Sequence, residues 1–174
     1  MGGKKDGEVR PRKVAVAIPF CKIGNEVHIC LVSSRKHDGQ YVLPKGGVEK
    51  GEDGWQSAVR EMWEEAGLKP SKEWVQVEAK DSFMTGSIDD HKPHKRSPST
   101  EHGSASFVPR ARYTAFLVNV QKGDPQCELD QWPEQHERKR LWTLCEDACK
   151  EIQWRKDIYH LLLQADGKLK AYQS

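Results

Sequence analysis

Short apolar runs near the start of the chain predict a sheet. Residues 13–20 (KVAVAIPF) and 27–34 (VHICLVSS) are rich in β-branched residues, and the polar stretch between them is typical of a turn. A further run at 41–44 (YVLP) ends at a proline, which cannot donate a hydrogen bond to a neighbouring strand. The glycine-rich residues 45–47 then predict a flexible loop.

The period of the hydrophobic pattern becomes helical after residue 53. Five apolar residues fall near one helical stripe: Trp55, Ala58, Val59, Met62 and Leu68. Gly67 stands where a left-handed residue ends many helices. The pattern therefore predicts a helix over 54–66.

The remaining apolar patterns predict more strands and a closing helix. Residues 74–84, 112–120 and 141–143 have the composition of strands. Residues 146–164 carry apolar side chains at helical spacing. We expect this last segment to form a C-terminal helix that packs on the sheet.

A long polar segment interrupts these elements. Residues 85–109 are rich in Ser, Pro, His and charge, which predicts a polar insertion loop. We find no repeat and no domain boundary, so residues 1–174 are predicted to form a single domain with a flexible tail over 1–11.

Composition limits the compartment and the partners. The net charge of +2 argues against bulk adhesion to nucleic acid or membrane, and no run approaches the roughly 20 apolar residues of a bilayer span. The five cysteines form no CxxC pair, which is typical of thiols in a reducing compartment. We expect a cytoplasmic protein, also found in the nucleus, with a secreted form that has lost its signal peptide as the alternative. We predict no membrane association and no need for nucleic acid or an obligate protein partner.

Carboxylates crowd the predicted helix. Glu61, Glu64 and Glu65 are spaced i, i+3 and i+4, so their side chains converge on one face. Such a cluster repels itself unless a hard divalent cation neutralises it, and Mg²⁺ or Mn²⁺ takes oxygen ligands. Glu52 precedes the helix in a loop, and Arg60 can hold a carboxylate through its planar fork. A solvated acidic helix face is the alternative interpretation of the three glutamates alone.

The whole stretch resembles the Nudix box at every specified position. Those positions are Gly46, Glu52, Arg60, Glu61, Met62, Glu64, Glu65, Gly67 and Leu68. The resemblance implies an α/β fold, the Nudix α/β/α sandwich, with a mixed central sheet, a box that forms loop, helix and loop, and a C-terminal helix. It also implies hydrolysis of a diphosphate linked to another group, with Mg²⁺ as cofactor and Mn²⁺ as substitute.

The same resemblance implies roles for the box residues. Glu61 and Glu65 would be the principal metal ligands, Glu64 would share a second ion, and the carbonyl of Lys45 would join them. Glu52 and Arg60 complete the predicted catalytic set with these three glutamates. The general base would be Glu64 or Glu65, because members of the family differ.

Basic residues outside the box point to the substrate. Each cluster alone is typical of a solvated surface, but together they favour a small polyanionic phosphate substrate. The runs LVSSRKHDGQYVLPKGGVEKGE and ERKRLWTLCEDACKEIQWRKD resemble the diphosphoinositol polyphosphate phosphohydrolase branch of Nudix enzymes, which also cleaves diadenosine polyphosphates in many members. The predicted substrate-binding residues are Arg12, Ser34, Arg35, Lys36, Lys45, Gly46, Gly47, Arg110, Arg112, Arg138, Lys139 and Lys156.

Two departures from that branch leave the substrate open. Lys45 replaces a glycine of the animal "PGGG" stretch, and residues 85–109 expand a short loop. A dinucleotide enzyme needs rings to stack a base; Trp132 is the best candidate for an exposed ring, whereas Trp63 and Trp142 are expected in the core. Three hypotheses remain: an inositol pyrophosphate phosphatase that also acts on diadenosine polyphosphates, a dinucleotide or nucleoside diphosphate hydrolase, and an inactive Nudix-fold binding module.

Overall fold

A computed structural model describes residues 7–173; residues 1–6 and 174 lie outside the described range, and so does that part of the predicted tail. Residues 7–11 have no regular secondary structure, and the flexibility expected for the tail stays a prediction. The elements are β1 (Arg12–Ile23), β2 (Glu26–Ser33), β3 (Tyr41–Val42), β4 (Lys45–Gly47), α1 (Gly54–Ala66), α2 (Lys72–Gln76), the 3-10 helix η1 (Lys80–Phe83), β5 (Met84–Asp89), β6 (Ala111–Asn119), β7 (Arg140–Leu144), α3 (Cys145–Ile152) and α4 (Lys156–Lys170).

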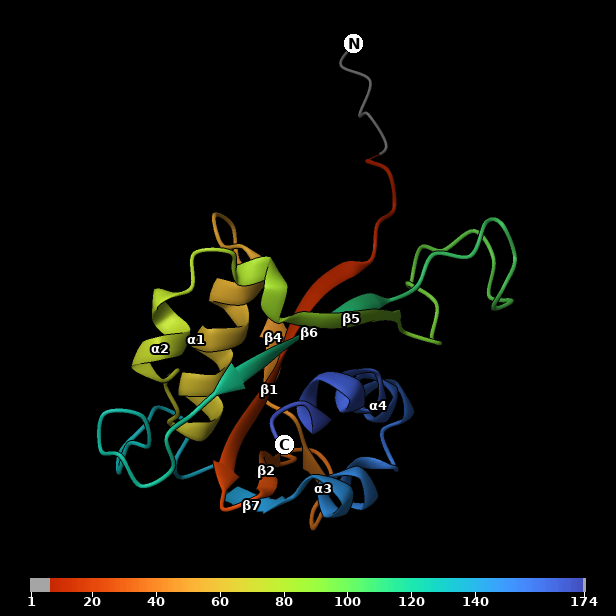
Figure 1. Ribbon diagram of the computed structural model, residues 1–174. Coiled ribbons are helices and arrows are strands. Elements are labelled where there is room, and N and C mark those ends of the chain that lie inside the picture. Colours follow the sequence, from red (N-terminus) through yellow and green to blue (C-terminus); the bar gives the residue numbers. More distant parts are fainter. Residues whose placement is uncertain (1–6, 174) are drawn as a thin grey trace.

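The strands form one mixed sheet with β1 at its centre (Figure 1). The order is β3-β2-β1-β6-β5, with β7 paired to β2 and β4 paired to β1. β1 and β6 run parallel, and the other pairs are antiparallel. The prediction of a mixed central sheet is confirmed.

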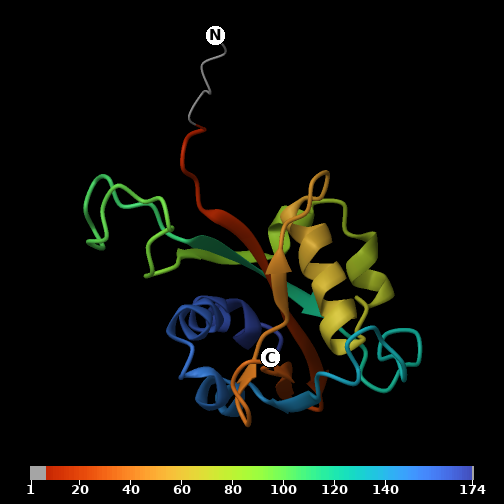
Figure 2. The same cartoon turned by 180° about the vertical axis from the view of Figure 1, so that it is seen from behind.

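Alternate residues of β1 face two different hydrophobic layers. Val16 and Ile18 pack in one core cluster with residues of α3 and α4, whereas Ala15 and Ala17 pack in the other with residues of α1. Successive side chains of a strand point to opposite faces, so this alternation requires cover on both sides. Figures 1 and 2 show α1 on one side of the sheet and α3 with α4 on the other. The predicted α/β/α sandwich is confirmed.

Helix α1 has the bounds that the sequence predicts. Asp53 caps its start, where the side chain accepts the N–H of Gln56 and the Gln56 side chain accepts the N–H of Asp53 in return. Gly67 ends the helix at φ 64°, in the left-handed region that favours glycine. Both helix ends are thus fixed by local chemistry.

Residues 45–47 form strand β4, so the predicted loop is wrong there. Val14 pairs with Gly47 and Val16 with Lys45, and the N–H of Ala17 donates to the carbonyl of Pro44 at 2.9 Å. The chain is extended here, and its glycines leave room for side chains that lie across the strand, as the site shows.

The predicted strand over 74–84 is also wrong, because the chain forms α2 and η1. Val75 and Val77, which supply the alternating pattern, are 57% and 37% exposed. Trp74 instead stacks on Phe83, with ring centroids 4.2 Å apart, and its Nε1–H donates to the carbonyl of Leu117 at 3.0 Å. Packing of one large ring outweighs the strand preference of the exposed valines.

The insertion begins five residues later than the sequence suggests. Residues 85–89 belong to β5, which pairs with β6 through Ser87↔Thr114 and Asp89↔Arg112. The irregular segment is therefore 90–110, which projects in green beyond the ends of β5 and β6 in Figure 1.

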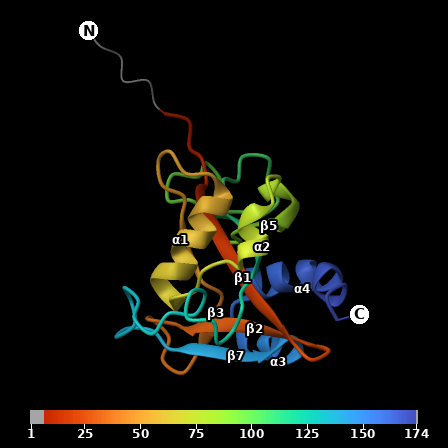
Figure 3. The same cartoon turned by 60° about the vertical axis from the view of Figure 1, so that its left-hand side comes forward.

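The predicted C-terminal helix over 146–164 is two helices, α3 and α4, seen at the edge of the molecule in Figure 3. The break covers residues 153–155, where the Nε1–H of Trp154 donates to the carbonyl of Tyr41 at 2.9 Å. Anchoring Trp154 to β3 turns the chain, and Arg155 at the start of α4 thereby reaches the site. No helix of the described residues has both the length and the hydropathy to span a bilayer.

Candidate active site

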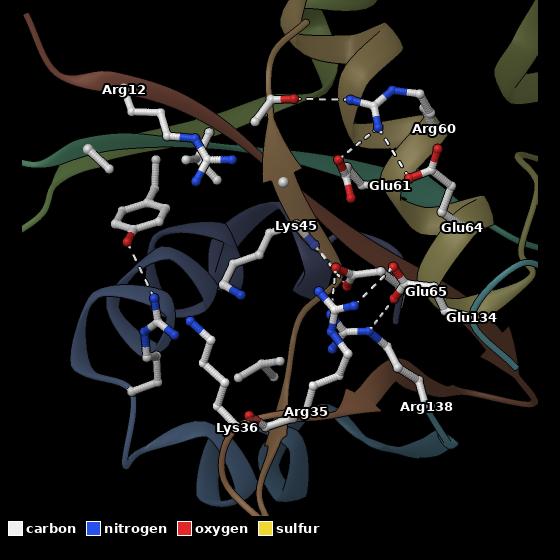
Figure 4. A pocket seen from close by; sticks show the side chains of 18 of the residues that line it. Arg12, Arg35, Lys36, Lys45, Arg60, Glu61, Glu64, Glu65, Glu134 and Arg138 are labelled. Atoms are coloured by element: carbon white, nitrogen blue, oxygen red, sulfur yellow. Dashed lines mark hydrogen bonds and ion pairs between the residues drawn. The ribbon is translucent and has the colours of Figure 1, made fainter. Parts of the chain in front are cut away.

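The three predicted glutamates converge on the face of α1 that borders a cavity of about 630 Å³ (Figure 4). Their side chains differ in exposure: that of Glu64 is 33% exposed, that of Glu61 13% and that of Glu65 only 5%. Burial without full neutralisation raises the pKa of Glu61, and the neighbouring Glu64 adds to that effect. The cluster is therefore a partly buried acidic wall and differs from a solvated helix face.

Arg60 holds this wall in place. Its guanidinium donates to Glu52 at 2.8 and 3.2 Å, to Glu61 at 2.8 Å, to Glu64 at 3.3 Å and to the carbonyl of Gly47 at 3.0 Å. The bond from Arg60 and a second from Ser57 lower the pKa of Glu52 to about 2. Glu52 does not line the cavity, so the structure places it as the anchor of Arg60.

Glu65 lies deepest and is held from two sides. One carboxylate oxygen accepts the backbone N–H of Lys45 at 3.3 Å, and the other accepts Arg138 at 3.0 Å. Burial raises the pKa of Glu65 to about 7, although the charges of Arg138 and Lys45 oppose the rise. Burial likewise lowers the pKa of the Lys45 side chain.

The two box glycines of β4 make room for charged side chains. A Cβ at Gly46 would overlap with the carboxylate of Glu61, and a Cβ at Gly47 would lie 2.6 Å from the guanidinium of Arg12. Their backbone φ angles are not in the left-handed region, so their role here is space and not turn geometry.

Cations form the other walls of the cavity. They come from separate elements: Arg12 from β1, Arg35 and Lys36 from the loop after β2, Lys45 from β4, Arg110 from the end of the insertion and Arg155 from the start of α4. Figure 4 shows Arg12, Lys36 and Lys45 facing the cavity opposite the glutamates of α1. Ser34, Gly46 and Gly47 also line it, and their predicted contact with substrate stays a prediction.

Arg35 and Arg138 are paired with carboxylates. Arg35 lies 3.0 Å from Glu137 and 3.7 Å from Glu134, and Arg138 lies 2.6 Å from Glu134. Arg138 also donates to the carbonyl of Ser33 at 3.0 Å and is only 7% exposed. The structure thus places Arg138 as a support of Glu65, and its predicted contact with substrate stays a prediction.

Three predicted substrate-binding residues do not line the cavity. They are Arg112, which pairs with Asp89 at 2.6 Å, Lys139, and Lys156. Arg155 takes the place of its neighbour Lys156, because the break before α4 turns Arg155 inward.

Tyr113 and Glu134 are among the cavity-lining residues that sequence reasoning missed. The hydroxyl of Tyr113 accepts a hydrogen bond from Arg155 at 3.3 Å. Glu134 lies in a loop without a motif, and its spacing from Arg138, i and i+4, is the one signal that could have found it.

Two of the three tryptophans considered in the sequence, Trp132 and Trp63, have surroundings that differ from expectation. Trp132 is no open platform, because the guanidinium of Arg140 lies 4.2 Å from its ring centroid and its Nε1–H donates to the carbonyl of Glu65 at 3.2 Å. Trp63 is 38% exposed, so its expected core position is wrong. Trp142 is partly buried against the core on the α1 face, as expected.

A helix with three converging glutamates, α1, on one face of an α/β/α sandwich is the arrangement that the family comparison below identifies. The NUDIX domain family matches residues 11–164, and the chain belongs to that family.

Curated relatives agree with this assignment. The chain is 30% identical over 150 residues to Nudix hydrolase 17, mitochondrial, of Arabidopsis thaliana, an alignment that covers 82% of this chain and 65% of that protein. It is 27% identical over 141 residues to diphosphoinositol polyphosphate phosphohydrolase 3-beta of Bos taurus, which covers 80% of this chain and 68% of that protein. The chain thus spans about two thirds of the length of these relatives.

The fold is also similar to solved structures. A binary complex of the Ap4A hydrolase of C. elegans superposes with a TM-score of 0.62 at 23% identity, covering 92% of this chain and 98% of that one. At this identity the likeness shows the fold.

Proposed function

We propose that the protein is a divalent-metal-dependent hydrolase of the diphosphate bond in inositol pyrophosphates, with diadenosine polyphosphates as further substrates. The observation that carries the proposal is the pairing of an acidic wall on α1 with cations from five different elements or loops around one cavity. An acidic wall suits metal ions, and dispersed cations suit several phosphates at once.

The residues fit a hard divalent cation such as Mg²⁺ or Mn²⁺. Glu61, Glu64 and Glu65 supply carboxylate oxygens from adjacent turns, and Gly46 leaves open the space in which the Glu61 carboxylate lies. These three glutamates would hold the metal, and the carbonyl of Lys45 is the further ligand we propose. When bound, the metal supplies positive charge that polarises the diphosphate oxygens and activates a water.

Glu65 and Glu64 would then have different roles. The oxygens of Glu65 already accept Lys45 and Arg138, so this carboxylate is fixed in one orientation and suits a ligand. Glu64 is more exposed, and among residues 7–173 its carboxylate has one short contact, a 3.3 Å bond from Arg60. We infer that Glu64 takes the proton of the attacking water, because it can reorient without leaving a buried partner unpaired.

The choice of substrate rests on the lack of an open Phe, Tyr or Trp ring in the described part of the cavity wall. Among the described residues that line the cavity, Tyr113 is the one Phe, Tyr or Trp, and it is only 4% exposed. A dinucleotide gains much of its binding from stacking of the base, whereas an inositol pyrophosphate needs mainly cations. The bovine relative, named as a diphosphoinositol polyphosphate phosphohydrolase, supports the same choice.

A direct comparison of substrates tests the proposal. Phosphate release is measured with Mg²⁺ from a diphosphoinositol pentakisphosphate and from diadenosine hexaphosphate, with Glu65→Gln as the blank. We expect faster turnover of the inositol substrate and none in the variant. Turnover of the dinucleotide alone would favour a dinucleotide hydrolase, and metal-independent binding without turnover of either would favour a binding module. The cytoplasm remains the proposed compartment, from the cysteine usage described above.

A further inference from the structure

Asp90 is a buried carboxylate that bonds two residues of the cavity wall, Arg110 and Tyr113. It follows β5 directly, opens the insertion 90–110, and is 0% exposed. One of its oxygens accepts the backbone N–H of Lys92 at 2.9 Å. The other accepts the guanidinium of Arg110 at 2.9 and 2.7 Å and the hydroxyl of Tyr113 at 3.2 Å. A buried carboxylate is costly unless it is paired in this way.

Two of the cavity's cations depend on this carboxylate. Arg110 bonds it directly, and the side chain of Arg110, which lines the cavity, remains 50% exposed. Arg155 reaches it indirectly, since the Arg155 guanidinium donates to the hydroxyl of Tyr113, which in turn donates to Asp90. One carboxylate thereby connects cations of two elements that are distant in sequence.

A second contact braces the element that carries Arg155. Nδ1 of His91 lies 3.2 Å from Asp157 in the first turn of α4 and 3.6 Å from Asp90. The end of β5 and the start of α4 are therefore held against each other beside the cavity. Arg155 immediately precedes α4, so its position follows that of this helix.

We propose that Asp90 is a positioning residue for substrate binding, which fixes Arg110 and Arg155 to receive phosphates remote from the bond that is cleaved. The inference rests on the proposed function, because it needs a substrate with several phosphates. An arginine side chain that is free to rotate loses conformational entropy when it binds, and a prior bond to Asp90 removes part of that loss.

The positioning role and net electrostatics predict opposite effects of an Asp90 substitution on substrate binding. Replacing Asp90 with Asn removes a negative charge beside a cavity for polyanions, so electrostatics alone predicts tighter binding. If Asp90 positions the arginines, the same change weakens binding. Asp89→Asn is a matched control: it removes the same charge one residue earlier, where Asp89 pairs with Arg112 outside the cavity.

The test measures kcat and KM for the diphosphoinositol substrate in the wild-type protein, Asp90→Asn and Asp89→Asn. We expect about a tenfold rise in KM for Asp90→Asn, with kcat within about twofold, the size of effect that loss of one charged contact gives. Asp89→Asn should leave KM unchanged. A KM for Asp90→Asn equal to or below that of Asp89→Asn would overturn the proposal.

Two further measurements separate positioning from folding and from the proposed function. Tyr113→Phe removes only the hydroxyl that connects Asp90 to Arg155, so it should raise KM by a smaller factor and lower the melting temperature by no more than about 4 °C. An unchanged KM in Tyr113→Phe would overturn the part of the proposal that concerns Arg155. Calorimetric binding of inositol hexakisphosphate needs no turnover; if the wild-type protein cleaves neither diphosphate, weaker binding by Asp90→Asn than by Asp89→Asn still supports positioning, and equal binding refutes it.

Discussion

The buried carboxylate of Glu65 is predicted to lower the stability of the metal-free protein. Its pKa of about 7 lies above the ordinary value of 4.5, so the carboxyl ionises at lower pH in the unfolded chain than in the folded protein. The free energy of unfolding therefore falls as the pH rises from about 4.5 to about 7. At pH 8 this loss amounts to about 3 kcal/mol, and at pH 5 to less than about 1 kcal/mol. Glu65→Gln keeps the shape of the side chain and removes the charge.

The Gln side chain of Glu65→Gln does not ionise, so the variant regains the free energy of unfolding that ionisation removes, but it loses one hydrogen bond. Its oxygen can still accept Arg138, but its NH₂ group then meets the N–H of Lys45, and the lost hydrogen bond costs about 1 kcal/mol. We therefore expect Glu65→Gln to be more stable than the wild-type protein by about 2 kcal/mol at pH 8 without metal. For a domain of this size that corresponds to a melting temperature about 4 to 8 °C higher.

Thermal melts in chelator at pH 8 and pH 5 measure the effect. The difference between Glu65→Gln and the wild-type protein should be present at pH 8 and nearly absent at pH 5. Addition of Mg²⁺ should raise the melting temperature of the wild-type protein and leave that of the variant unchanged. Glu64→Gln, whose carboxylate is a third exposed, is the control and should change little in chelator. A variant that melts at or below the wild-type temperature at pH 8 would refute the reasoning.

Three other predictions concern the same wall. Gly46→Ala should weaken metal binding about tenfold or more, because its Cβ overlaps with the Glu61 carboxylate; titration calorimetry with Mn²⁺ measures this, and unchanged affinity would contradict it. Arg60→Met should lower the free energy of unfolding, since the partly buried carboxylates of Glu52 and Glu61 lose their shared partner; denaturation at pH 8 tests this, and an unchanged free energy of unfolding would count against it. Asp53→Ala should cost about 1 kcal/mol through the lost helix cap without changing kcat, and a fall in kcat would show that the box loop has moved.

Local chemistry explains why so much of the site could be predicted. The spacing of Glu61, Glu64 and Glu65 fixes one helix face whatever surrounds it, and Gly67 ends the helix by its own backbone preference. The bounds of α1 and the convergence of the glutamates therefore follow from the sequence alone.

The remaining features depend on contacts between distant segments. The exposed valines of 74–84 mimic a strand, and only the stack of Trp74 on Phe83 shows why the chain turns instead. Arg155 and Lys156 are equivalent in sequence, and the anchoring of Trp154 on Tyr41 decides which of them faces the cavity. Trp132 looks like a free ring until Arg140 is placed over it.

The two ends of the insertion 90–110 are joined into a narrow neck. The N–H of Asp90 donates to the carbonyl of Ala111 and that of Arg110 to the carbonyl of Lys92, each at 2.8 Å, and the side chains of Asp90 and Arg110 close the same gap. Beyond a fixed neck, added loop length costs little, about 0.6 kcal/mol for each doubling. The insertion is consequently a natural grafting point: residues between Pro93 and Pro109, which form their own bridge, can be exchanged for an epitope tag or a reporter sequence without displacing the arginine that lines the cavity.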